Sequence, residues 1–173
     1  MKKYLINYYE NTRQYYGNYH DHKEISAWSG LVIHILFCTF IVLANPTGQL
    51  KIIMTIGFTI SVIIVTILLF MYIRNQLNLK DKAGALAAAS NFILTELIAK
   101  DDNSTDFREY LSVEESSDIK YQSTHVLPKK LLNKVKIYDS RGRGAQDFTR
   151  TMIYGLLVIS AISVIFYRWI AIL

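Results

Sequence analysis

Apolar residues gather into three long runs along this chain, separated by polar segments. The runs extend from Trp28 to Asn45, from Ile52 to Ile73 and from Met152 to Leu173, and none of them contains an acidic residue. Helices of about 20 apolar residues are what a hydrocarbon layer about 30 Å thick requires. The pattern therefore predicts an all-α integral membrane protein with three transmembrane helices.

The first apolar run is the shortest, and it contains His34. A buried helix of a soluble protein is therefore the alternative interpretation of this run. Residues 45–49, Asn-Pro-Thr-Gly-Gln, are dense in turn formers and leave little chain between the first and second runs. We therefore expect residues 28–73 to form a transmembrane hairpin and residues 152–173 to form the third transmembrane helix.

Residues 1–27 are predicted to form an amphipathic helix beside the membrane. Tyrosines recur there at spacings of four, seven and four, which places them on one helical face. These tyrosines are Tyr4, Tyr8, Tyr15 and Tyr19, and Leu5, Ile6, Tyr9 and Tyr16 lie alongside them, so the predicted face is broad and amphipathic. Such a face suits a helix that lies at the membrane surface or packs against neighbouring subunits. Gly17 is a candidate break in this helix.

Residues 74–151 are predicted to form one basic cytoplasmic region with a small amount of helical structure. A heptad-like seam predicts a helix near residues 77–99. Its members are Leu79, Ala83, Leu86, Ser90, Ile93 and Leu97. Packing onto the N-terminal segment and self-association are both consistent with this seam. A short basic helix is expected to begin at Pro128.

The distribution of charge predicts how the helices are oriented in the membrane. Of the 173 residues 51% are hydrophobic, and the net charge is +5. Residues 1–27 hold four Lys and Arg residues, the hairpin turn holds only Lys51, and residues 74–151 hold 13. Because cationic loops resist translocation, we expect the N-terminus and residues 74–151 in the cytoplasm and the C-terminus outside a bacterial inner membrane. Arg168 is expected to extend outward from the third helix toward the polar boundary.

Several polar side chains within the predicted membrane helices are candidates for a pore or a gate. His34 is an ionisable group well inside the first helix, with Cys38 one turn later. The second and third helices carry hydroxyl groups on one face each. These are Thr55, Thr59 and Thr66 on the second helix and Ser160 and Ser163 on the third. Hydrogen bonding between packed helices is the alternative role of all these residues.

Cationic side chains before the third helix are candidates for contact with lipid head groups or another anionic ligand. They are Lys129, Lys130, Arg141 and Arg143. The Ser-Arg-Gly-Arg-Gly sequence at 140–144 would expose backbone amides to a phosphate, but no Gly-Lys-Ser/Thr follows, as a P-loop requires. Lipid anchoring is therefore favoured, and a nucleotide or nucleic acid is the alternative ligand.

Patterns typical of catalysis are missing from the sequence. We find no Ser-His-Asp set, no Cys-x-x-Cys pair and no dinucleotide-binding glycine pattern. His20, His22 and Glu24 form the densest polar cluster, but histidines two residues apart point to different faces of a helix, so we expect no metal site there. We therefore expect neither enzymatic activity nor a cofactor.

This layout resembles the small transmembrane effectors of bacterial anti-phage defence systems, and among them the SLATT-type two-transmembrane effectors. The resemblance rests on Trp28–Asn45, the Asn-Pro-Thr-Gly turn, Ile52–Ile73 and the Leu79–Leu97 helix. It implies a homo-oligomer that opens a gated pore or disrupts the inner membrane when a cytoplasmic protein, small molecule or nucleic acid triggers it. The alternative function is a membrane-anchored sensor or interaction module that recruits a cytoplasmic partner without conducting ions.

Overall fold

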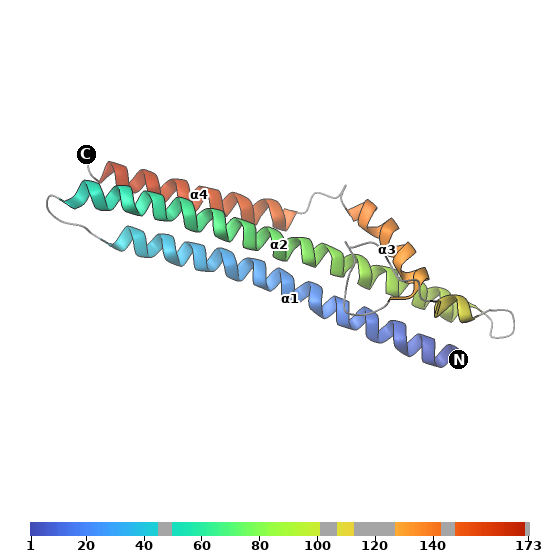
Figure 1. Ribbon diagram of the computed structural model, residues 1–173. Coiled ribbons are helices and arrows are strands. Elements are labelled where there is room, and N and C mark those ends of the chain that lie inside the picture. The colour runs from blue at the N-terminus through green and yellow to red at the C-terminus, as the bar shows by residue number, and fades with distance from the viewer. Residues whose placement is uncertain (45–49, 101–106, 113–126, 143–147, 172–173) are drawn as a thin grey trace. The chain divides into compact units, whose positions relative to one another are not determined.

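The chain is all-helical throughout the residues that the computed structural model describes, which are 1–44, 50–100, 107–112, 127–142 and 148–171 (Figure 1). The side chains of residues 139–142 lie outside this description. The helices are α1 (Lys2–Leu43), α2 (Lys51–Ala99), the short 3-10 helix η2 (Phe107–Tyr110), α3 (Lys129–Gly142) and α4 (Phe148–Ile170). The all-α prediction is therefore confirmed, while the predicted turn at 45–49 lies outside the described residues.

Three of these helices, α1, α2 and α4, are long and apolar enough to cross a membrane, by length and composition. This agrees with the three apolar runs in the sequence. Both α1 and α2 are much longer than a membrane span, with 42 and 49 residues. In α2 the second apolar run continues without a break into the helix predicted near residues 77–99. In α1 the helix also runs through Gly17, so the expected break is wrong.

The chain divides into two compact units. Unit 1 consists of Met1–Asp21 with Lys80–Ala145, and unit 2 consists of His22–Leu79 with Gln146–Leu173. Each unit combines segments that are far apart in the sequence, because α1 and α2 each contribute to both. The borders therefore fall within continuous helices, a few residues from the ends of the apolar runs.

The core of unit 1 forms where the N-terminal half of α1 and the C-terminal half of α2 meet η2 and α3. Leu5, Tyr9 and Tyr16 are its buried members from α1. Its other buried members are Ala83, Leu86, Ala89, Ile93 and Leu97 from α2, with Tyr110, Leu127, Leu131 and Val135. The α2 residues include most of the predicted heptad seam. Of the two alternatives for that seam, the structure shows packing onto the N-terminal segment.

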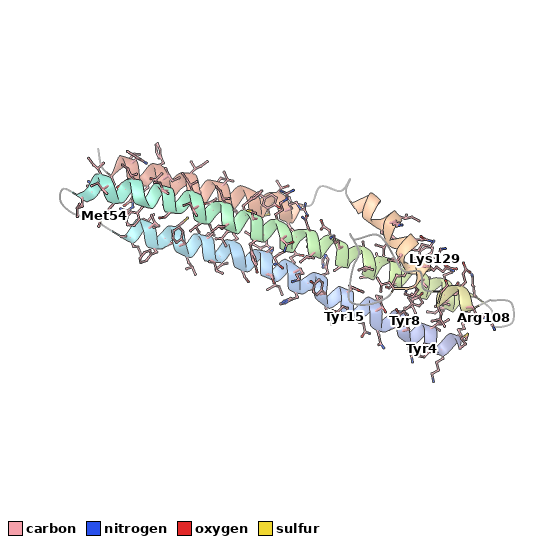
Figure 2. All side chains as sticks on the ribbon, in the orientation of Figure 1. Tyr4, Tyr8, Tyr15, Met54, Arg108 and Lys129 are labelled. Carbon is pink, nitrogen blue, oxygen red and sulfur yellow. The ribbon has the colours of Figure 1, made fainter. Side chains whose placement is uncertain are left out.

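The core of unit 1 buries one side of the broad face that the sequence predicts for α1, the side that bears Leu5, Tyr9 and Tyr16. Tyr4 and Tyr15 are 66% and 56% exposed, whereas Leu5 and Tyr9 are fully buried. Figure 2 labels Tyr4, Tyr8 and Tyr15 along α1. One residue along a helix turns the side chain by about 100°, so packing through Leu5 and Tyr9 carries Tyr4 and Tyr15 to the outside. The side of α1 that bears Leu5 and Tyr9 is thus covered by its own chain, and contact of the exposed tyrosines with the membrane surface or a neighbouring subunit stays a prediction.

The core of unit 2 joins α1, α2 and α4 along two clusters of buried side chains. One contains Ala27, Leu31, Ile73, Leu77, Ile153 and Leu157, and the other contains Cys38, Ile41, Val62, Ala161 and Val164. The outward faces are strongly apolar, with Leu36, Ile53 and Ile162 each more than 60% exposed. A surface of this kind is compatible with a lipid environment.

Replacing Gly30 with leucine is expected to destabilise unit 2 by about 1–3 kcal/mol through overpacking. A Cβ atom on Gly30 would lie 3.0 Å from Cγ1 of Ile73 and 3.2 Å from Cδ1 of Tyr72, so α1 and α2 would have to separate. Gly57 is the matched control, because a Cβ atom there meets no atom within 4 Å. Thermal unfolding in detergent should give a lower midpoint for Gly30→Leu than for Gly57→Leu. Equal midpoints would contradict this close helix packing.

Candidate functional sites

The first candidate site is a hydrogen-bonded cluster inside unit 2, here called the His34 hub, which consists of His34, Thr66 and Ser160. His34 on α1 is fully buried. Its Nε2 atom lies 2.9 Å from Oγ1 of Thr66 on α2, and its Nδ1 atom lies 3.1 Å from Oγ of Ser160 on α4. Cys38 completes the surroundings, with its sulfur 3.7 Å from Nδ1. One imidazole thus connects all three long helices of unit 2.

The hydrogen bonds of the hub fit a neutral imidazole. The hydroxyl of Thr66 donates its proton to the carbonyl of Val62 at 2.6 Å, so it accepts a hydrogen bond from Nε2–H of His34. Nδ1 is then an acceptor for the hydroxyl of Ser160. That hydroxyl has a second acceptor within reach, the carbonyl of Leu157 at 3.0 Å. Both nitrogens of His34 are therefore satisfied within one copy of the chain.

The other predicted pore residues lie apart from this hub. Thr55 is buried, and Thr59 is half-buried, with its hydroxyl donating to the carbonyl of Thr55 at 2.9 Å. Ser163 is exposed on α4. The structure thus brings together three of the predicted residues, His34, Thr66 and Ser160, and leaves their role in a pore or gate as a prediction.

Arg168 on α4 is buried against the end of α1. It is only 5% exposed, and its guanidinium donates to the carbonyls of Ile41 and Ala44 at the end of α1. It also lies 4.9 Å from the centroid of the Phe58 ring. The last carbonyls of a helix have no partner within that helix, so they attract a cation. Arg168 therefore caps the C-terminal end of α1, and its expected extension toward the polar boundary of the membrane stays a prediction.

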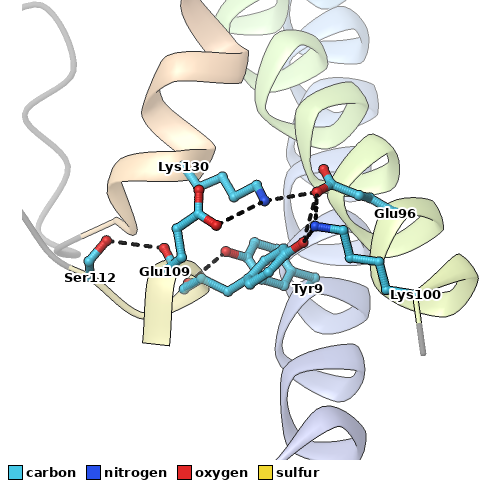
Figure 3. Close-up of polar contacts among 7 residues, drawn as sticks. Tyr9, Glu96, Lys100, Glu109, Ser112 and Lys130 are labelled. Atoms are coloured by element: carbon cyan, nitrogen blue, oxygen red, sulfur yellow. Dashed lines mark hydrogen bonds and ion pairs between the residues drawn. The ribbon is translucent and has the colours of Figure 1, made fainter. Parts of the chain in front are cut away.

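The second candidate site lies in unit 1 and is here called the Glu96 clasp, which consists of Glu96, Lys100, Tyr110 and Lys130 (Figure 3). Oε1 of Glu96 accepts hydrogen bonds at 2.8 Å from both the Tyr110 hydroxyl and Nζ of Lys130. The same oxygen lies 3.0 Å from Nζ of Lys100. Lys100 also donates to the Tyr110 hydroxyl at 3.0 Å. A single oxygen of α2 thus holds donors from η2, from α3 and from Lys100, the residue that follows α2.

Further contacts connect the clasp to α1. The hydroxyl of Tyr9 donates to the backbone carbonyl of Tyr110 at 2.9 Å, and Nζ of Lys2 donates to the carbonyl of Lys100 at 2.6 Å. On the other side, Nζ of Lys130 lies 3.7 Å from the centroid of the Tyr110 ring, which adds a cation–π contact. The clasp therefore fastens η2 and α3 to the helix pair formed by α1 and α2.

The charges of the clasp stabilise one another. Burial by itself would raise the pKa of Glu96, but the hydrogen bonds from Lys130, Tyr110 and Lys100 outweigh it and lower the pKa to about 2. Burial would lower the pKa of Lys130, and the bonds to Glu96 and Tyr110 reverse that effect. The bonds from Lys100 to Tyr110 and Glu96 raise the pKa of its ammonium group. Glu96 is therefore an anion between two cations at neutral pH.

The stability of unit 1 is expected to fall under acid because of Glu96. The folded-state pKa of about 2 lies below the ordinary value of 4.5, so the clasp contributes its full stabilisation above pH 4.5 and loses it progressively down to pH 2. Amide hydrogen exchange in α3, corrected for the intrinsic pH dependence, should report this loss. The Glu96→Gln variant should lack this part of the pH dependence. An unchanged acid profile in that variant would contradict the assignment to Glu96.

The clasp contains one of the predicted lipid-contact residues and leaves the others elsewhere. Lys130 belongs to it, and only 14% of its side chain is exposed, whereas Lys129 is exposed at the start of α3. The side chain of Arg141 and all of Arg143 lie outside the described residues. Lipid or ligand contact by these four residues stays a prediction.

The polar cluster beside the first apolar run is spread over different faces of α1. His20 packs toward Gly84, and its Nδ1 atom lies 3.1 Å from a carboxylate oxygen of Asp21, whereas His22 is exposed. Among the described residues, no three His, Cys, Asp or Glu side chains are grouped so that they could hold a metal ion.

Comparisons with protein families, with curated proteins and with solved structures give no match.

Proposed function

We propose that this chain is a multi-pass protein of a bacterial inner membrane in which unit 2 is the anchor and unit 1 is a cytoplasmic interaction module. The His34 hub carries the proposal. An imidazole that lines an aqueous path has to face water or a neighbouring copy, whereas His34 is fully buried and has Thr66 and Ser160 as partners. A polar cluster satisfied in this way is suited to joining helices within an anchor.

The distribution of cations supports the orientation that we propose. The segments that contribute to unit 1 are basic, whereas residues 44–50 between α1 and α2 contain no Lys or Arg, and Lys51 begins α2. Under the positive-inside rule this places the N-terminus in the cytoplasm and the C-terminus outside. Exposed cations such as Lys129, together with Arg141 and Arg143, would then be available to anionic lipid head groups or a nucleotide ligand.

The folded state of unit 1 supports its role as a module that binds a partner. Its buried core and the Glu96 clasp give α3 a fixed place on α1 and α2, and a preorganised surface loses less conformational entropy on binding than a disordered segment. The partner that we propose is a cytoplasmic protein, and the chemistry needs neither catalysis nor a cofactor.

A second candidate function is a homo-oligomeric effector that forms a gated pore or disrupts the membrane, as in anti-phage defence. The exposure of Ser163 on α4 favours it, because a hydroxyl on an outward face could line a path between copies. Most of the apolar span of α2 is also uncovered in a single chain. Several copies around an axis would be needed to enclose such a path.

A measurement of membrane potential distinguishes the interaction module from the pore. The full chain is produced at increasing levels in bacteria, with and without phage infection, and potential and growth are followed. If the chain is a membrane-anchored interaction module, membrane potential and growth should stay unchanged at every level of protein production in both cultures. Depolarisation that grows with the amount of protein and is suppressed by Ser163→Leu would overturn the anchor in favour of a pore. Ile162→Leu is the matched control, because Ile162 is an exposed neighbour of Ser163 with no hydroxyl to lose.

A further inference from the structure

The outer side of α1 in unit 1 is uncharged over almost half of its circumference. At about 100° per residue, the residues within an arc of about 160° are all polar but neutral. They are Tyr4, Asn7, Tyr8, Asn11, Thr12, Gln14, Tyr15, Asn18 and Tyr19. The charged residues of this stretch, Lys2, Lys3, Glu10 and Arg13, all fall on the rest of the circumference. In a chain with 19% charged residues, this neutral surface is a distinct feature.

One edge of the neutral surface, at Tyr8 and Tyr19, is partly buried against the core of unit 1, and the rest is largely exposed. Tyr4 and Tyr15 are 66% and 56% exposed, and Asn11 and Asn18 are exposed as well. The core uses Leu5, Tyr9 and Tyr16, whose side chains point about 120° away. The exposed ring of Tyr15 stacks on the half-buried ring of Tyr19, with 6.4 Å between the ring centroids. Tyrosine and asparagine at this exposure are typical of surfaces that bind protein.

The middle of this surface follows the spacing of a coiled-coil seam. Tyr4, Tyr8, Asn11, Tyr15 and Asn18 are separated by four, three, four and three residues. That alternation keeps one stripe of a helix against a second, parallel helix. We call these five residues the Tyr/Asn seam.

We propose that the Tyr/Asn seam is the surface through which two copies of this chain associate, with their α1 helices parallel. Copies of one membrane protein share the same orientation in a bilayer, so their α1 helices run in the same direction at the same height. Each seam residue then lies opposite the same residue of the second copy. Asn11 can hydrogen-bond to Asn11 of that copy, and Asn18 to Asn18, which fixes the register of the two helices. The inference goes beyond the proposed function and applies to either candidate.

The absence of charged side chains on the seam favours a second copy of the chain as its binding partner. A neutral seam meets its own equivalent without repulsion, whereas any charge on it would face a like charge in a parallel pair. An anionic lipid surface would need Lys or Arg on this face, and the seam has none. A strongly acidic or basic partner would likewise find no complementary charge.

Disulfide cross-linking of the full chain in native membranes tests the proposal. The background is Cys38→Ala, which removes the native cysteine. Asn11→Cys is compared with Asn91→Cys on α2, because both asparagines are exposed and belong to unit 1. We expect mild oxidation to yield a cross-linked pair of chains at position 11 and little at position 91. Equal yields at the two positions, or no cross-linked pair at position 11, would overturn the proposal.

A charge placed on the seam provides the second measurement. In the Tyr15→Cys variant of the same background, adding Asn11→Glu should lower the cross-linking yield about tenfold, because like charges meet across the pair. Adding Asn91→Glu should leave the yield unchanged. If cross-linking at position 15 were insensitive to Asn11→Glu, the contact would be incidental and the proposal wrong. Cross-linking of position 11 to a different protein, in place of a second copy, would also overturn it.

Discussion

Replacing Glu96 with glutamine is expected to release α3 and η2 from α2 and to destabilise unit 1 by about 2–3 kcal/mol. Glutamine keeps the shape of the side chain but removes the charge that Lys100, Tyr110 and Lys130 share. Two ammonium groups then remain close together without their anion, and only 14% of the Lys130 side chain is exposed. Hydrogen exchange of the α3 backbone amides in detergent should become about 30-fold faster, the factor that corresponds to about 2 kcal/mol.

Glu109→Gln is the matched control for that variant. Glu109 also approaches Lys130, but at 3.9 Å and with 68% of its side chain exposed, so solvent screens the pair. We expect its removal to change the stability of unit 1 by less than about 0.5 kcal/mol. If Glu96→Gln and Glu109→Gln destabilised unit 1 equally, the loss of any acidic side chain near Lys130 would explain the change. The bonds of the clasp would then have no special role.

Replacing His34 with alanine is expected to destabilise unit 2 by about 2–3 kcal/mol. The loss of packing dominates, because the hydroxyls of Thr66 and Ser160 retain the carbonyls of Val62 and Leu157 as acceptors. Hydrogen bonds between helices in membranes contribute about 0.6 kcal/mol on average, which is too little to account for the whole effect. Thr66→Val, which removes the acceptor for Nε2–H but keeps the volume, should therefore cost less than His34→Ala.

Thermal unfolding in detergent measures both changes, with His22→Ala as the matched control because His22 is exposed on the same helix. The midpoint should fall in the order His22→Ala, Thr66→Val, His34→Ala, with the first close to the unchanged protein. Equal midpoints for His34→Ala and His22→Ala would show that the hub contributes nothing to holding α1, α2 and α4 together.

Much of the architecture follows from the sequence because it depends on local pattern. The three apolar runs alone predict the helices that are long enough to span a membrane, and the seam from Ala83 to Leu97 predicts a buried face. For α1 the sequence predicts a broad face but not which side of that face is buried. Its tyrosines and its apolar residues overlap around the helix, and only the packing against α2, η2 and α3 shows that Leu5 and Tyr9 are buried while Tyr4 and Tyr15 are exposed.

The two sites differ in how far the sequence could reveal them. His34, Thr66 and Ser160 were identifiable because polar residues are rare in apolar runs, although only the structure shows them in contact. In the clasp, the Glu96–Lys100 pair at i, i+4 was the available signal. Tyr110 and Lys130 lie 14 and 34 residues from Glu96, and the carbonyls that Arg168 binds are more than 120 residues away. Contacts at such separations depend on the fold and leave no spacing pattern.

The contact between Tyr9 and Tyr110 has a consequence for the synthesis of the protein. These residues are 101 positions apart, and the ribosome adds about 5–20 residues per second. Tyr9 is therefore translated about 5–20 s before Tyr110, and the core residues of α2 are translated in between. Until η2 and α3 follow, the core residues of α1 and α2 lack the cover that Tyr110, Leu131 and Val135 later provide.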